Sequence, residues 1–307
     1  MSLDTDLLLD RRRLKRRLNF WRVAAVAAFA IAGLVAVAPK GAGIGGSHVV
    51  RINVRGVITE DRQLLDAVAA LAKDSSVKAV IVAVDSPGGS VSGGESLRAA
   101  LIRVAAAKPV VTVMGGTAAS AGYMVSLPAA RIFARDATLT GSIGVILQTG
   151  ETSGLLERLG VTATAITSGP LKDQPSFTRP LTPEGRAYLD SLVQDFYDQF
   201  VTMVSEARHI DKDRVKQLAD GRAYTGRQAL ALNLVDEIGG EIEARTWLQQ
   251  NKQIPESLPI RDLKFGSFYE RAAGNALSGL ANTLVASVLG GHAQPIGALS
   301  IWQGGTP

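Results

Sequence analysis

Ser120 lies in a run of small residues, 115–123 (GGTAASAGY), where a strand pattern gives way to a helix pattern. A serine at such a junction can act as a nucleophile, because nearby backbone N–H groups can stabilise the oxyanion that forms on an attacked carbonyl. A serine at the same position also commonly caps the helix with its side chain. The choice between these roles depends on whether the chain offers a base that can activate the hydroxyl.

The supply of possible bases is narrow, because the chain has no cysteine and only three histidines. The three histidines are scattered: His48 opens the first predicted strand, His209 ends a long helix, and His292 lies in the C-terminal tail. Their positions therefore give poor support for a Ser-His-Asp triad. A lysine is the other common partner, provided that burial keeps its amine uncharged. Lys172, in residues 168–173 (SGPLKD), is the candidate, although a lysine in a loop is more often a solvated charge.

A second glycine-rich turn, residues 85–90 (DSPGGS), directly follows the apolar run 78–84 (KAVIVAV). Paired glycines allow backbone N–H groups to point outward without obstruction by a Cβ atom. Such a turn suits an oxyanion hole or a phosphate cradle, and many turns of this kind are purely structural.

The elements around these turns alternate between strand and helix patterns, which predicts a parallel sheet with helices on both faces. Strands are predicted at 48–54, 78–84, 109–114, 131–134, 143–147 and 161–166. Helices are predicted at 64–73, 95–106, from about Ser120, and at 153–159. The fold class is therefore α/β.

The last third of the chain is predicted to be helical. Thr182 and Pro183 form a good helix start, with threonine as the N-cap and proline in the first turn. Apolar residues then recur at helical spacing from Leu189 to Val204, and shorter helices are expected near 214–218, 226–231 and 242–249. The segment 276–289 in the tail is apolar enough to pack on a partner or a membrane, although an ordinary core helix is the simpler interpretation.

The positive charge of the chain is concentrated at its N-terminus. Residues 1–22 carry seven basic and three acidic side chains, which accounts for +4 of the net charge of +5. The remainder is too balanced for a surface that binds nucleic acid. The basic cluster precedes the apolar run 23–38, and this order predicts an uncleaved membrane anchor over 20–38 with a cytoplasmic N-terminus. A cleaved signal peptide is the alternative, but Pro39 would follow the cut.

The five segments DSPGGSVSGGE, GGTAASAGYMVS, TGSIGV, SGPLKDQPSFTRPLTPEGR and GRAYTGRQALALNLVDEIGG together resemble the bacterial signal peptide peptidases of the SppA type. Their order and spacing agree with that family over residues 48–250. The resemblance implies a Clp protease/crotonase-like fold, a parallel β-sheet flanked by helices. It also implies that the chain is the short, single-repeat form of the family.

The resemblance also implies roles for individual residues. Ser120 matches the nucleophile, Lys172 the general base, and Ser142 the serine that orients the lysine. The N–H groups of Gly89 and Ala121 would form the oxyanion hole. The chain departs from the family pattern at Ala121, where glycine is often found, and at Pro170, which is unusual within the lysine motif. Neither change removes a catalytic group.

Together with the predicted anchor, the resemblance implies a membrane-anchored serine endopeptidase that degrades cleaved signal peptides on the extracytoplasmic side of the inner membrane. No cofactor or metal is expected, and the partners would be apolar peptides, the membrane and further copies of the chain. The resemblance implies a ring of such copies, with eight as the expected number. The alternatives are a catalytically silent scaffold on the same fold or a crotonase-like acyl-CoA enzyme. The predicted organisation is a basic N-terminus (1–19), an anchor (20–38), a linker (39–47), the peptidase domain (48–254) and a C-terminal extension (255–307).

Overall fold

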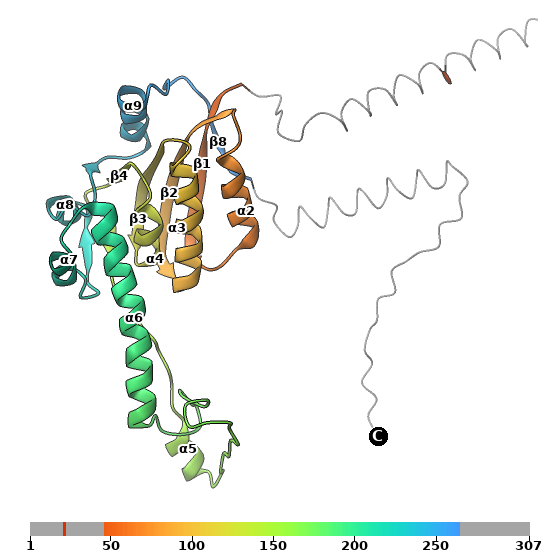
Figure 1. Ribbon diagram of the computed structural model, residues 1–307, viewed down its shortest axis with the longest axis vertical. Coiled ribbons are helices and arrows are strands. Elements are labelled where there is room, and N and C mark those ends of the chain that lie inside the picture. Colours follow the sequence, from red (N-terminus) through yellow and green to blue (C-terminus); the bar gives the residue numbers. More distant parts are fainter. Residues whose placement is uncertain (1–20, 23–45, 265–307) are drawn as a thin grey trace, which may run out of the picture.

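The computed structural model of the chain describes residues 21–22 and 46–264. Within these residues eight strands form one mixed sheet whose core is parallel (Figure 1). The strands are β1 (His48–Ile58), β2 (Val77–Gly89), β3 (Val110–Ala119), β4 (Arg131–Ala134), β5 (Leu139–Gly141), β6 (Ala223–Thr225), β7 (Glu237–Ile238) and β8 (Ile260–Asp262). The predicted α/β class with a parallel sheet flanked by helices is confirmed.

The helices follow the sequence pattern to within a few residues. They are α2 (Arg62–Leu71), α3 (Val91–Ala105), α4 (Ala121–Ser126), α5 (Ser153–Arg158), α6 (Pro183–Arg208), α7 (Lys212–Leu218), α8 (Gly226–Ala231) and α9 (Glu241–Lys252). The predicted start of α6 is confirmed, because the Thr182 side chain accepts a hydrogen bond from the Gly185 N–H at 2.9 Å.

The main strand order is β6-β5-β3-β2-β1-β8. Strand β4 lies outside this order and pairs with β3 on one side and with β7 on the other. Every pairing in the sheet is parallel except the one between β5 and β6. The carboxyl ends of β1, β2, β3 and β5 therefore lie at one edge of the sheet. In an open parallel sheet this edge is where ligands bind.

Two hydrophobic clusters cover the two faces of the sheet. The larger cluster joins β1, β2 and β3 to α2, α3, α4 and α6, and includes the fully buried Phe200. The smaller cluster lies on the other face, where Ala244 and Leu248 of α9 pack on Ile81, Val111 and Phe133. Burial on both faces explains why these strands read as continuous apolar runs.

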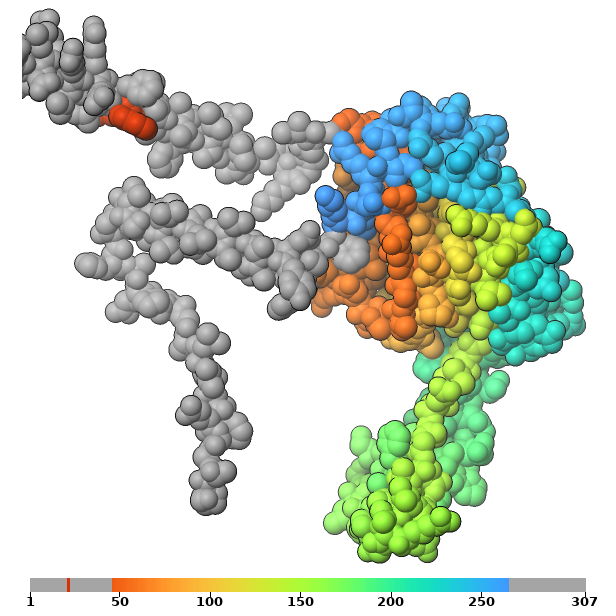
Figure 2. All heavy atoms as spheres, turned by 180° about the vertical axis from the view of Figure 1, so that it is seen from behind, coloured from red at the N-terminus to blue at the C-terminus, as the bar shows by residue number. Residues whose placement is uncertain are grey.

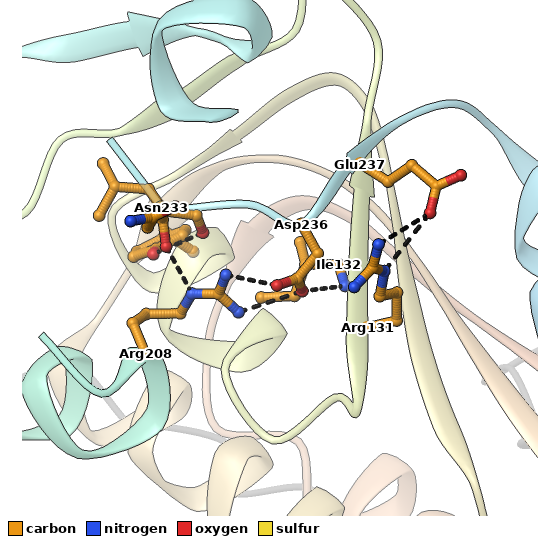
Figure 3. A network of polar contacts seen from close by, with 8 residues as sticks. Arg131, Ile132, Arg208, Asn233, Asp236 and Glu237 are labelled. Atoms are coloured by element: carbon orange, nitrogen blue, oxygen red, sulfur yellow. Dashed lines mark hydrogen bonds and ion pairs between the residues drawn. The ribbon is translucent and has the colours of Figure 1, made fainter. Parts of the chain in front are cut away.

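Helix α6 is fixed to the body at its C-terminal end by a partly buried ion pair (Figure 3). The Arg208 guanidinium donates to Asp236 at 2.6 and 3.1 Å and to the Asn233 carbonyl at 2.9 Å. Asp236 also accepts from the Ile132 N–H at the start of β4, at 2.7 Å. This network joins the helix, the loop before β7 and the sheet, and together with the core packing of α6 it helps to fix the direction in which the helix leaves the body.

The N-terminal end of α6 reaches a segment that projects from the body, here called the arm (residues 144–182; Figures 1 and 2). The arm contains α5, as predicted. The predicted strands at 143–147 and 161–166 are wrong, because neither segment joins the sheet. Their apolar residues have strand character, but the arm lies beyond the sheet edge, where no neighbouring strand is available to pair with them.

Other predictions lie at the limits of the described residues. The expected anchor over 20–38 falls outside them except for residues 21 and 22, as do the basic N-terminus and most of the C-terminal extension. Among the residues that are described, no helix has the length and apolar character needed to span a membrane.

Candidate active site

Ser120 occupies the sharp turn between β3 and α4. Its backbone has φ 53° and ψ −120°, a conformation that is strained for a residue with a side chain. The turn is held by the Ser120 N–H, which donates to the Gly141 carbonyl, and by the Ser120 carbonyl, which accepts from the Met124 N–H, both at 2.9 Å. The hydroxyl makes no capping hydrogen bond, so the alternative interpretation of Ser120 as a helix-capping side chain is wrong.

The glycine turn at the end of β2 lies directly against this serine. A Cβ atom on Gly88 would stand 2.8 Å from the Ser120 Cβ and 3.2 Å from its Oγ, and Gly88 has φ +120°. A Cβ on Gly89 would collide with the Ile58 carbonyl oxygen at 1.9 Å. Both positions therefore require glycine. Gly88 is a site residue that the sequence prediction missed, because the motif alone does not show which glycine faces the serine.

Two polar side chains hold the glycine turns by accepting hydrogen bonds from backbone N–H groups. The buried Ser86 hydroxyl accepts a hydrogen bond from the Gly88 N–H at 3.1 Å. The N–H of Gly89 is therefore the next donor along the turn that an oxyanion could use. Asp85 accepts from the Thr117 N–H at 3.0 Å and so connects the end of β2 to the end of β3. The two turns that the sequence singled out are thus one connected structure.

Ser142 is brought to the same place by the end of β5. Its N–H donates to the Arg222 carbonyl at 2.9 Å, and the preceding residue, Gly141, holds the Ser120 N–H. Both serines line one cavity of about 440 Å³. The structure therefore brings together Ser120, Ser142 and the Gly88–Gly89 turn, with Ala121 as the first residue of α4. The first N–H groups of a helix have no partner within it, so Ala121 keeps a donor position beside the nucleophile.

One wall of the cavity comes from residues that the sequence prediction did not name as site residues. Val193, Gln194 and Tyr197 face the cavity from α6, and Asp220 faces it from the loop before β6. Burial raises the pKa of Tyr197, and the negative charges of Asp198 and Asp220 add to this effect. The pKa of Asp220 is lowered by its hydrogen bonds to Arg222. Only the helical spacing of Val193 gave any sign that α6 would reach the site.

Lys172 does not line this cavity. It lies exposed in the arm, where its backbone N–H donates to the Gly169 carbonyl at 3.2 Å. The neighbouring Asp173 pairs with Arg179. Across the described residues, no three His, Asp or Glu side chains gather in a way that could hold a metal ion.

The sequence profile of peptidase family S49 matches residues 102–255, which span Ser120, Ser142, Lys172 and the cavity wall on α6. The chain belongs to peptidase family S49. This membership confirms the predicted class of enzyme, a serine endopeptidase, and the resemblance to the signal peptide peptidases on which the prediction was based.

Relatives in this family carry names of the same kind. A protein of Enterococcus faecium named as a signal peptide peptidase SppA is 34% identical over 232 residues, which cover 71% of this chain and 67% of the relative. Protease 4 of Salmonella typhi is 42% identical over 169 residues, which cover 54% of this chain and 27% of that protein. Among solved structures, a mutant of ClpP1 from Listeria monocytogenes is 16% identical with a TM-score of 0.42, over 63% of this chain and 92% of that chain.

Proposed function

We propose that this S49 peptidase cleaves apolar peptides, including cleaved signal peptides, with Ser120 as nucleophile and Lys172 as general base. The observation that carries the proposal is the position of Ser120. It is held in a strained turn, its hydroxyl makes no capping hydrogen bond, and it opens on a cavity next to the Gly88–Gly89 turn. This arrangement suits acyl transfer, in which an oxyanion must be stabilised beside the nucleophile.

In the proposed reaction the neutral Lys172 amine accepts the proton of the Ser120 hydroxyl while Oγ bonds to the peptide carbonyl carbon. The N–H groups of Gly89 and Ala121 hold the resulting oxyanion. As the C–N bond breaks, Lys172 returns the proton to the leaving amine, and an acyl-enzyme remains. Water then attacks the acyl-enzyme by the same route and releases Ser120. Ser142 would orient the lysine amine through its hydroxyl.

The exposed position of Lys172 sets a condition on this proposal. A lysine in water is protonated at neutral pH, so Lys172 must become buried in order to act as a base. The exposed apolar residues of the arm provide a reason for such burial, because they would be covered if the arm docked on a second copy of the chain. The proposal therefore includes a homo-oligomer. It also includes a membrane anchor at residues 20–38, with the peptidase domain on the extracytoplasmic side, and a fold of the Clp protease/crotonase-like type.

The experiment compares Ser120→Ala and Lys172→Ala with the wild-type protein on an unfolded apolar peptide. Each variant is expected to lose at least about a thousandfold in kcat/KM. Lys73→Ala, which removes an exposed lysine at the end of α2, is the matched control and should retain full activity. Full activity of Lys172→Ala would rule out the dyad. Failure of a fluorophosphonate to label Ser120 in the wild type would instead favour a silent scaffold.

Mixing the two inactive variants tests the source of the lysine. If Lys172 acts on the Ser120 of another copy, subunit exchange between Ser120→Ala and Lys172→Ala restores part of the activity. If it acts within its own chain, the mixture stays inactive.

A further inference from the structure

A second hollow lies at the carboxyl end of β1, across β2 from Ser120. Its volume is about 240 Å³. Its walls come from β1, α2 and α3, which lie side by side in Figure 1. Six apolar side chains line it: Val54, Val57, Ile58, Leu64, Leu65 and Leu97.

The register of the sheet places this hollow on the same edge as the serine. Val57 and Ile58 of β1 stand opposite Gly88 and Gly89, and β2 is flanked by β1 on one side and β3 on the other. Neighbouring strands are about 4.8 Å apart, so the ends of β1 and β3 are separated by about 10 Å. An extended peptide covers this distance in about three residues.

The local structure at the end of β1 keeps the hollow open. Gly56 has φ +68°, and the ladder with β2 shifts register between Arg55 and Val57. The resulting bulge turns Val57 outward, so that its side chain is 68% exposed. Val57 is thus exposed at the mouth of the hollow, whereas Val54, Ile58 and Leu97 in its wall are buried.

Four of the eleven residues that line the hollow are polar, namely Asn53, Arg55, Thr59 and Asp61, and the Asn53 amide already donates a hydrogen bond to Asp262 at 2.9 Å. The Asp61 carboxylate already accepts hydrogen bonds from the Gln63 and Leu64 N–H groups at 2.9 and 3.2 Å, as the N-cap of α2. Arg55 is the other charged residue of the lining, and it is exposed. The hollow therefore offers a ligand mainly apolar contact.

We propose that this hollow binds an apolar side chain of the peptide substrate, about three residues from the bond that Ser120 cleaves. The inference rests on the proposed function, since it requires that peptides lie along this edge of the sheet. Its support is the register of the sheet, which places the Gly88–Gly89 turn next to Ser120 on one side and opposite Val57 and Ile58 of the hollow on the other. A peptide with apolar residues on both sides of this turn would be bound at two places and held in extended form.

The test uses Val57→Glu, which places a charge at the mouth of the hollow on an exposed side chain that the fold can spare. Ile242→Glu on α9 is the matched control, because Ile242 is also exposed, at 76%, and lies away from this edge. The substrates are a series of serine-alanine peptides that carry one leucine at successive distances from the cleaved bond, and a short amino-acid ester that cannot reach the hollow.

Wild type and Ile242→Glu are expected to cleave fastest when the leucine lies about three residues from the cleaved bond. Val57→Glu should lose about tenfold in kcat/KM on that peptide and hydrolyse the short ester at the wild-type rate. If Val57→Glu and wild type preferred the same leucine position to the same degree, the inference would be overturned, even though the peptidase activity itself would be established.

A binding measurement separates this inference from the proposed function. The leucine peptide, labelled with a fluorophore, is titrated against Ser120→Ala with and without Val57→Glu, and weaker binding of the double variant is expected. If the wild type cleaves no peptide, the proposed function fails, while this titration still decides whether the hollow binds the peptide. If Val57→Glu alone changes the sedimentation of the protein, the hollow is a contact between copies and the inference is wrong.

Discussion

Phe200 and Phe177 show how differently the chain uses the same residue type in its body and in its arm. Phe200, on the part of α6 that crosses the body, is 1% exposed and belongs to the larger core cluster. Phe177, in the arm, is 68% exposed and packs near Gly150. Among the described residues, neither core cluster includes any residue of the arm. The body is therefore stabilised by its own burial, whereas the arm, which projects from the body in Figure 2, leaves several large apolar side chains exposed.

This difference explains why the serine is fully positioned and the lysine is not. Ser120 inherits its geometry from β3, β5 and the glycine turn of β2, all of which lie in the packed body. Lys172 belongs to the arm, whose local hydrogen bonds include those from Thr152 to the Phe177 carbonyl, both at 2.7 Å. The two halves of the proposed dyad thus differ in how strongly the single chain determines their positions.

The largest expected effect contrasts the two phenylalanines directly. Phe200→Ala should destabilise the protein by about 4 kcal/mol, because it removes a fully buried ring and leaves a cavity. Phe177→Ala should change the free energy of unfolding by less than about 0.5 kcal/mol, as for other exposed positions. Urea unfolding of both variants, under conditions where the protein is monomeric, provides the measurement. A large effect of Phe177→Ala in the monomer would show that the arm has a core of its own.

The sequence predicted best those elements whose pattern reports on burial in the body. The continuous apolar runs of β2 and β3, and the Thr182-Pro183 start of α6, were recognisable because one short segment carries the whole signal. The short strands β5, β6 and β8 were missed, since they exist only through their pairing with distant segments. In the arm the same apolar signal was misread as two strands, because a sequence cannot show that a partner strand is absent.

The site followed the same rule. Ser120, Ser142, Gly89 and Ala121 were predicted from motifs, and the structure brings them to one edge of the sheet, whereas Lys172, predicted with them, lies in the arm. Tyr197 and Asp220 could not be recognised, because they reach the cavity only through the direction of α6 and the loop before β6. That direction depends in part on the contact of Arg208 with Asp236, two residues that are far from the serine in the chain.

The next effect concerns the ion pairs of the two regions. Asp236→Ala should cost about 3 kcal/mol, because it leaves the Arg208 guanidinium, 10% exposed, and the Ile132 N–H without their acceptor. Asp173→Ala in the arm removes the partner of Arg179, where both side chains are about one-third exposed, and should cost less than about 1 kcal/mol. Thermal unfolding of the two variants and wild type compares these values.

Asp236→Ala should also alter the activity, since α6 forms one wall of the Ser120 cavity. The rise in KM for an apolar peptide should exceed the fall in kcat, because the change displaces the wall and not the nucleophile. Equal stability losses in the two aspartate variants would contradict the view that the body and the arm are held in different ways.

The smallest effect concerns β8, a peripheral segment that, unlike the arm, is tied to the body. Asp262 accepts hydrogen bonds from Arg51 at 2.6 and 3.2 Å and from Asn53 at 2.9 Å, and these contacts lower its pKa. Because the pKa of the folded state lies below that of the unfolded chain, the contribution of Asp262 to stability is complete above about pH 4. It is lost as the pH falls through the lowered value of the folded state.

Asp262→Asn tests this pH dependence, because it removes the charge and keeps the shape of the side chain. At neutral pH the variant should be less stable than wild type by less than about 1 kcal/mol, since the pair is half exposed to solvent. Urea unfolding at a series of falling pH values should show this difference shrinking below about pH 4, as the wild-type carboxylate takes up its proton. A difference that stays constant down to the lowest pH would mean that the charge of Asp262 does not hold β8 to the sheet, and that its edge is no better anchored than the arm.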